Sequence, residues 1–264
     1  MGVSLPHVGR VGRLDLRFAS RRGETVIADA YCEVPSKVMR VHRQPGSDLA
    51  HAILMHTTAG LFDGDRVDCA IHVERGARVA LTQQAATKVH PSTGAGAAQS
   101  VHVRVESGGE LHLHLKPIIL FAGSQLTQRT VLELQRGARF SYWETLMAGR
   151  IGRGEAWRFA RFRSETTLSI DGRVSFLDRF DVRPDRETST AWGAGSCGYL
   201  STGLCVDDEE RSVRLLEDLH DLMPEAGVDS PSPGLTIVRA PCSSGIERRR
   251  LQDLFTAETC RARL

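Results

Sequence analysis

Residues 73–79 read VERGARV, and the same pattern returns as VESGGEL at residues 105–111 and as LQRGARF at residues 134–140. A shorter copy, SIDGRV, stands at residues 169–174. The central glycines of successive copies are 32, 29 and 35 residues apart. Glycine accepts the positive φ that a tight turn between two strands requires. We therefore interpret each copy as a hairpin turn, and each period as one repeating unit of structure.

The segments around these turns predict strands. Apolar and polar residues alternate in Leu14–Phe18, in Val101–Val105 and in Leu111–Leu115, which is the period of a strand with one buried face. Hairpins bury their apolar faces only when they stack on one another. We expect a mainly β protein with a stacked or coiled multi-strand body over residues 11–200. An ordinary β-sandwich with coincidental turns is the alternative.

The last quarter of the chain has a different pattern. It predicts first a helix that opens with Asp207–Glu210, with acids in its first turn, and is stopped by Pro224. A Ser/Pro turn at Asp229–Pro233, a short strand at Leu235–Arg239 and a helix that begins with the capping box Ser244–Glu247 follow. We expect a small helix–strand–helix part over residues 201–264. We interpret residues 1–264 as one domain.

Composition excludes several classes of protein. The chain has 264 residues, a net charge of +2, 41% hydrophobic and 25% charged residues, which are ordinary globular values. The two signs of charge are interleaved, whereas a nucleic-acid binder concentrates a basic excess. No stretch approaches the roughly 20 apolar residues of a membrane span. The N-terminus shows no apolar signal region, so we expect a cytoplasmic protein whose six cysteines are reduced thiols.

Three polar stretches are candidates for function. Residues 56–66 place two carboxylates around a glycine-rich turn, residues 82–90 are polar where a strand pattern predicts apolar residues, and residues 144–155 place acids and arginines around three glycines. Turn chemistry and internal ion pairs are the ordinary interpretation. The functional interpretation is a polar crevice or channel lining. Its candidate residues are Asp63, Asp65, Thr82, Gln83, Glu144, Arg150 and Glu155.

The histidines offer candidate metal ligands. His112 and His114 lie two apart on a predicted strand and therefore share a face, which suits a borderline metal such as nickel or zinc. A solvated strand face is the alternative. His56 and His90 lie near the polar turns. The Gly193–Gly198 run matches the spacing of a dinucleotide-binding loop, but poor helix formers follow it, and we expect a surface loop there.

The polar stretches carry a family resemblance. The runs TTAGLFDGD at residues 57–65, GARVALTQQAATK at residues 76–88 and ETLMAGRIGRGE at residues 144–155 resemble motifs of the UreD (UreH) urease accessory proteins. The run PIILFAGS at residues 117–124 resembles a further family segment. Ala59 stands where the family usually has glycine. The resemblance extends over about residues 11–240, nearly the whole chain.

The resemblance implies a non-enzymatic maturation factor with a mostly β fold. Such a protein binds urease apoprotein and a UreF-like partner, and the partner recruits the UreG-like GTPase that delivers nickel. The resemblance also implies an internal polar path for transient Ni²⁺, with no tightly bound cofactor, and the seven candidate polar residues are its expected lining. An ion in transit needs weak, exchangeable oxygen or nitrogen ligands.

Two other functions stay open on the residues alone. A small hydrolase would use Asp63 and Asp65 as a carboxylate pair. A standalone nickel-binding protein would favour a histidine-rich tract, whereas the ten histidines here are dispersed.

Overall fold

The computed structural model describes residues 9–43, 49–184 and 197–260. Its strands are β1 (Val11–Arg21), β2 (Glu24–Cys32), β3 (Ser36–Val38), β4 (His42–Arg43), β5 (Ala50–His56), β6 (Arg66–Val73), β7 (Arg78–Gln84), β8 (Thr87–Val89), β9 (Ala97–Val105), β10 (Glu110–His114), β11 (Ile118–Leu120), β12 (Gln125–Leu134), β13 (Arg139–Met147), β14 (Arg161–Ile170), β15 (Arg173–Val182), β16 (Tyr199–Val206), β17 (Gly227–Ser232) and β18 (Leu235–Cys242). Its helices are the 3₁₀ turn η1 (Ile151–Arg153), α2 (Glu209–Leu222) and α3 (Gly245–Thr259). Most of the Gly193–Gly198 run lies outside the described residues.

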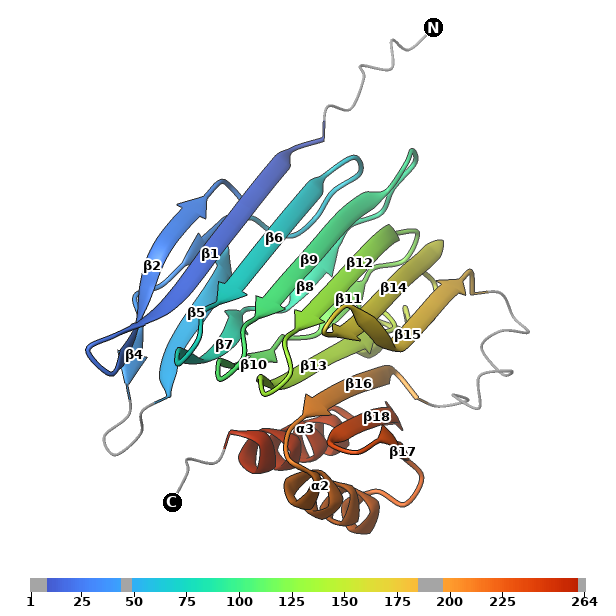
Figure 1. Ribbon diagram of the computed structural model, residues 1–264. Helices are drawn as coiled ribbons and strands as arrows, with labels where there is room; N and C mark the ends of the chain where they lie inside the picture. The colour runs from blue at the N-terminus through green and yellow to red at the C-terminus, as the bar shows by residue number, and fades with distance from the viewer. Residues whose placement is uncertain (1–8, 44–48, 185–196, 261–264) are drawn as a thin grey trace, which may run out of the picture.

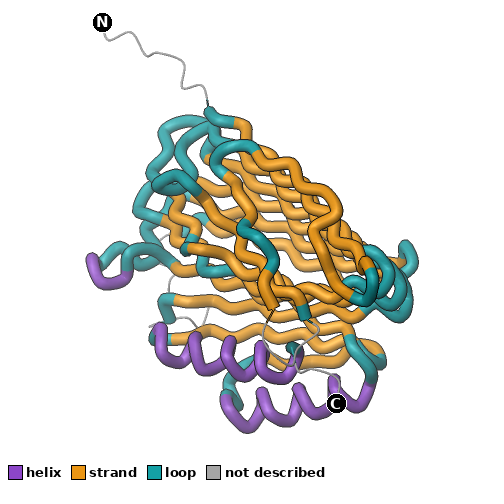
Figure 2. Tube along the Cα trace, turned by 90° about the vertical axis from the view of Figure 1, so that its left-hand side faces the viewer, coloured by secondary structure: helices purple, strands orange, loops and turns teal. Residues whose placement is uncertain are grey.

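The strands form two sheets that lie face to face (Figures 1 and 2). The first sheet has seven strands in the order β15-β14-β12-β9-β6-β1-β2. The second has eleven, with β17-β18-β16-β13-β10-β7-β5-β3 as its main path. Through the middle of the molecule the chain passes back and forth between the two sheets, with the short strands β8 and β11 following β7 and β10 in the second sheet. The chain therefore winds as a coil, and this confirms the stacked β body rather than the ordinary sandwich.

The repeated glycine turns are corners of this coil. Gly76 joins β6 to β7, which lie in different sheets, and each of these strands pairs in parallel with the equivalent strand of the next coil. The Gly76 amide donates to the Gly108 carbonyl at 3.2 Å, and the Gly108 amide donates to the Gly137 carbonyl at 3.0 Å. Our prediction of hairpins was wrong for these three copies. A corner and a hairpin both need a residue with φ > 0, so the glycine alone does not distinguish them. Gly172 does close a hairpin, between the antiparallel strands β14 and β15.

Parallel strands in register place equivalent positions of successive coils in rows. Between the sheets these rows form two apolar clusters, one that includes Phe18 and Leu111 and one that includes Leu120 and Phe162. A third cluster, which includes Trp143, lies between the second sheet and the helices α2 and α3. Figure 2 shows both helices on one side of the β body.

The C-terminal part continues the second sheet. The predicted strand at residues 235–239 is half of a hairpin, because β17 occupies most of the predicted turn and pairs with β18. Asp208 caps α2 by accepting the Arg211 amide at 3.0 Å, and Glu209 and Glu210 occupy its first turn as predicted. Ser244 caps α3 by accepting the Glu247 amide at 3.2 Å. None of the helices in the ranges given above is long and apolar enough to cross a bilayer.

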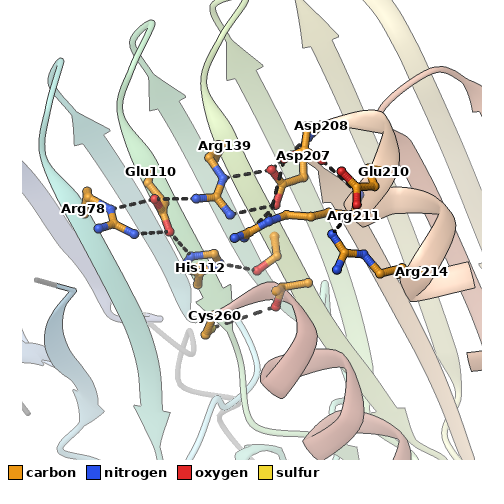
Figure 3. A network of polar contacts seen from close by, with 12 residues as sticks. Arg78, Glu110, His112, Arg139, Asp207, Asp208, Glu210, Arg211, Arg214 and Cys260 are labelled. Carbon is orange, nitrogen blue, oxygen red and sulfur yellow. Dashed lines mark hydrogen bonds and ion pairs between the residues drawn. The ribbon is translucent and has the colours of Figure 1, made fainter. Parts of the chain in front are cut away.

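A ladder of buried charges crosses the coils on the outer face of the second sheet (Figure 3). The second residue after each turn glycine contributes one member, so Glu110 pairs in register with both Arg78 and Arg139. The Arg78 Nε donates to Glu110 at 2.7 Å, and Arg139 Nη2 donates to Asp207 at 2.8 Å. Burial raises the pKa of Glu110, but hydrogen bonds from His112 and Arg78 outweigh it, and the pKa falls to about 2.

Candidate functional site

Polar side chains interrupt the apolar space between the two sheets. Gln99, Gln128 and Ser164 are neighbours in register on β9, β12 and β14. Their side chains point inward, to the side where most other residues of these strands are apolar. Glu144 and Gln83 enter the same space from the second sheet. We call the set Gln83, Thr87, Gln99, Gln128, Tyr142 and Glu144 the polar band. Because the coils stack in parallel, its members lie across several coils.

The middle of the polar band is a chain of hydrogen bonds. The Gln99 amide donates to the Gln128 carbonyl oxygen, and the Gln128 amide donates to the Glu144 carboxylate. The Tyr142 hydroxyl donates to the same carboxylate at 3.0 Å. At the other end, the Gln83 amide donates to the Thr87 hydroxyl at 2.9 Å. These partners satisfy polar groups that would otherwise be costly to bury.

Two cavities adjoin this row of hydrogen-bonded side chains. Gln99 lines a cavity of ≈60 Å³ together with His56 and Gln83. Glu144 lines a second cavity of ≈20 Å³ together with Asp178. Ile118 lines both cavities. The smaller cavity has room for about one water and the larger for about four. A hydrogen-bonded row of exchangeable oxygen and nitrogen groups therefore leads from one small, mostly apolar cavity to the other.

Glu144 has the most unusual environment in the polar band. Burial raises the pKa of Glu144, and the nearby negative charge of Asp178 acts in the same direction. The hydrogen bonds from Gln128 and Tyr142 oppose this rise. A carboxylate held in such a place gains from a nearby cation more than an exposed one does, because little water screens it. Glu144 was expected in a loop with Arg150 and Glu155, but it lies within β13.

Asp63 and Asp65 lie at a corner of the coil and do not line either cavity. The Asp63 carboxylate is buried and accepts the amides of Thr93, Gly94 and Gly96 at 3.1, 2.7 and 2.8 Å. The Asp65 carboxylate accepts two further backbone amides, each at 2.9 Å. Both acids therefore fasten turns, which was the ordinary interpretation of this stretch.

Arg150, Glu155 and His90 also lie at the edge of the coil. The predicted ion pair is present, with Arg150 Nε 2.7 Å from a Glu155 oxygen. The Arg150 guanidinium lies 4.3 Å from the centroid of the Phe121 ring, and Phe121 contacts His90 edge to face. His90 stacks on Phe62 with 4.1 Å between centroids. These side chains form a column along successive corners, separate from the polar band.

Thr82, His112 and His114 point to the opposite face of the second sheet, where α3 covers them. They line a cavity of ≈520 Å³ between that face and the helix. The solvated-face alternative is wrong, because His112 is only 2% and His114 only 7% exposed. Burial lowers the pKa of His114 to about 3. The predicted site residues thus fall into three places: the polar band, the coil edge and this outer cavity.

The sequence profile described as UreD urease accessory protein matches residues 10–262. This chain belongs to the UreD family.

Individual UreD proteins match over most of their length. The urease accessory protein UreD of Deinococcus radiodurans is 34% identical over 215 residues, which covers 80% of this chain and 76% of the relative. That of Thermosynechococcus vestitus is 32% identical over 215 residues, 81% of this chain and 78% of the relative. Urease accessory protein UreD 2 of Streptomyces griseus is 30% identical over 245 residues, 90% of this chain and 82% of the relative.

Glycines of the UreD-like motifs allow close backbone contacts within and between these motifs. Gly60 has a φ of 142°, and a Cβ there would lie 2.3 Å from the Lys88 carbonyl oxygen. Gly149 has a φ of 143°, and a Cβ there would lie 2.3 Å from the Glu155 carbonyl oxygen. Only glycine fits such contacts. Leu61 also donates its amide to the Lys88 carbonyl at 2.8 Å, so the first two motifs join directly.

Sequence reasoning missed part of the polar band and one candidate ligand. Gln99 and Gln128 alternate in phase with apolar residues of their strands, and a polar side chain in that phase was a readable signal of an internal site. Asp178 gives the same signal on β15, where it alternates in phase with Phe176 and Phe180, and it was also missed. Cys260, which reaches the outer cavity beside the two histidines, lies 146 residues along the chain from His114.

Proposed function

We propose that this chain serves urease maturation as a scaffold that passes nickel between proteins along its polar band. Membership of the UreD family supports the maturation role. The nickel path is supported by the hydrogen bonds that connect Gln99, Gln128 and Glu144, because these side chains link the two inner cavities. In this proposal Ni²⁺ is cargo, bound and released in steps.

The chemistry of the polar band suits a cation that must move on. Amide and hydroxyl oxygens bind a divalent ion weakly, and a single carboxylate adds attraction without closing a tight site. Polar walls lower the cost of carrying a charge through the interior of a protein. The buried carboxylate of Glu144 attracts a passing cation more strongly than an exposed one would, because little water screens its charge.

The decisive experiment compares Glu144→Gln with the parent chain in a urease activation assay at limiting nickel. The substitution keeps the shape and removes the charge, so we expect slower activation that excess nickel restores. Glu165→Gln is the matched control, because Glu165 lies on β14 and pairs with Arg179 on the exposed face. An unchanged rate for Glu144→Gln at limiting nickel would refute the path.

The scaffold role includes specific partners. We propose that the chain binds urease apoprotein and a UreF-like protein, and through the latter a UreG-like GTPase. Co-expression with a UreF-like protein, followed by size-exclusion chromatography, tests this directly. We expect the two to elute as one complex. Separate elution at matched concentrations would contradict the scaffold role.

We further propose that the chain acts without catalytic turnover. The hydrolase alternative rests on Asp63 and Asp65, and the carboxylates of both already accept backbone amides. A carboxylate engaged in this way is poorly placed to exchange a proton with a substrate.

A further inference from the structure

The outer cavity brings together three side chains that ligate metals. His112 and His114 reach it from β10, and Cys260 reaches it from the end of α3. One donor atom of each residue lies within 4.8 Å of the other two. Figure 3 shows His112 and Cys260 facing the same space below the charge ladder. Within the three described ranges, this is the only such group of histidine, cysteine and acidic side chains.

The orientation of both imidazoles matches that of metal ligands. His112 Nδ1 and His114 Nε2 each lie 2.8 Å from the Ser141 hydroxyl oxygen, so these two nitrogens converge on one point. The other nitrogen of His112 lies 2.8 Å from Glu110, and that of His114 lies 3.1 Å from the Thr256 hydroxyl. A ligating histidine is usually held in this manner, with its second nitrogen bonded to a carboxylate or another oxygen.

We propose that His112, His114 and Cys260 bind a divalent ion of the nickel and zinc class, with the fourth position open to the ≈520 Å³ cavity. Two imidazoles and a thiolate are the donors that such borderline ions prefer. The Ser141 hydroxyl, which lies between the two nitrogens, rotates aside to admit the ion. Binding releases the thiol proton of Cys260 and any proton on the two converging nitrogens, and each imidazole keeps its proton on the nitrogen that faces Glu110 or Thr256.

The open position makes this an exchangeable site. Closed structural sites use four protein ligands, whereas three ligands leave room for a water or a group from another molecule. Lys116, Arg248 and Arg249 line the same cavity, and their positive charge favours an anionic fourth ligand such as a carboxylate. Bonds of about 2.0–2.3 Å draw the three donor atoms closer than in the empty site. The ion would therefore tie the end of α3 to β10.

The metal site itself does not depend on the proposed function. Only the identification of nickel as its physiological ion rests on that function. Metal binding is tested on the full chain alone. After treatment with a chelator, titration with Co²⁺ should give one equivalent of tetrahedral cobalt with a thiolate-to-metal charge-transfer band. Zn²⁺ and Ni²⁺ should abolish this band by displacement. Cys260→Ser should remove the band and weaken binding at least tenfold, while Cys197→Ser, the matched control, should change neither.

A second measurement needs no variant. Alkylation of each cysteine is followed by mass spectrometry with and without Zn²⁺ or Ni²⁺. We expect the metal to protect Cys260 strongly and to leave the exposed Cys32 unchanged. Absence of the cobalt band in the parent chain, an unchanged band in Cys260→Ser, or equal alkylation of Cys260 with and without metal would each overturn the site.

The urease activation assay separates this inference from the proposed function. If Cys260→Ser loses the metal and also slows activation at limiting nickel, the site lies on the route of the cargo. If it loses the metal and activates urease normally, the site stands as a metal site of its own. The Glu144→Gln result bears on the polar band and not on this site.

Discussion

Replacement of Glu110 tests how far the buried charge ladder stabilises the fold. The carboxylate is 3% exposed and lies between Arg78 and Arg139, with His112 beside it. Its pKa falls from an ordinary value of 4.5 to about 2. A tenfold change in proton affinity corresponds to about 1.4 kcal/mol, so the charge on Glu110 stabilises the folded state by about 3 kcal/mol. Glu110→Gln should lower the free energy of unfolding by about that amount.

The pH dependence provides a second check with a definite sign. Because the pKa of Glu110 is lower in the folded state, its contribution is complete above pH 4.5 and is lost as the pH falls through about 2. The difference between parent and Glu110→Gln should therefore shrink from about 3 kcal/mol at neutral pH to about 1 kcal/mol near pH 3.

Urea unfolding followed by circular dichroism, with a chelator present, measures both quantities. Glu133→Gln is the control, since Glu133 pairs with His102 on the surface and is 48% exposed. The control should change the free energy of unfolding by less than about 0.5 kcal/mol. A Glu110→Gln variant as stable as this control at neutral pH would refute the reasoning.

Two further substitutions test close contacts in the fold. Gly203→Ala should destabilise the protein by about 1–3 kcal/mol, because the new Cβ would lie 2.9 Å from the Trp143 ring. Gly152→Ala, where the added atom meets nothing within 4 Å, should be neutral in the same denaturation assay, and equal effects at the two sites would contradict the packing argument. Asp63→Asn should cost about 1–3 kcal/mol, because it removes an oxygen that accepts backbone amides such as that of Gly96. An unchanged midpoint of unfolding would show that the Asp63 turn does not depend on its charge.

Strand periodicity and the repeated turns were sufficient to predict a stacked β body, but not how its strands pair. Gly76 and Gly172 carry the same local signal, and only the second closes a hairpin. The turn residues specify a positive φ, while the choice between a corner and a hairpin depends on which distant strand offers free backbone groups. Because tertiary pairing decides between the two, the residues of the turn itself do not show which one forms.

The candidate site was predictable in part for a similar reason. Gln83 and Glu144 were found because polar residues stood out in stretches that resemble a family motif. Gln128 became meaningful only through its register with Gln99. Cys260 could not be linked to His114, because their approach depends on how α3 packs on the second sheet.

The ends of the two sheets set a limit on the length of the molecule. A stack of parallel coils can grow by adding further coils, because each outermost strand presents unpaired backbone N–H and C=O groups. Yet β2, β15, β17 and β3, the outermost strands of the described sheets, all run antiparallel to their neighbours. The parallel pairing of the middle coils therefore ends at each edge in an antiparallel strand. Each coil adds about 4.8 Å to the stack, so the number of coils sets the distance between the two end surfaces of the molecule.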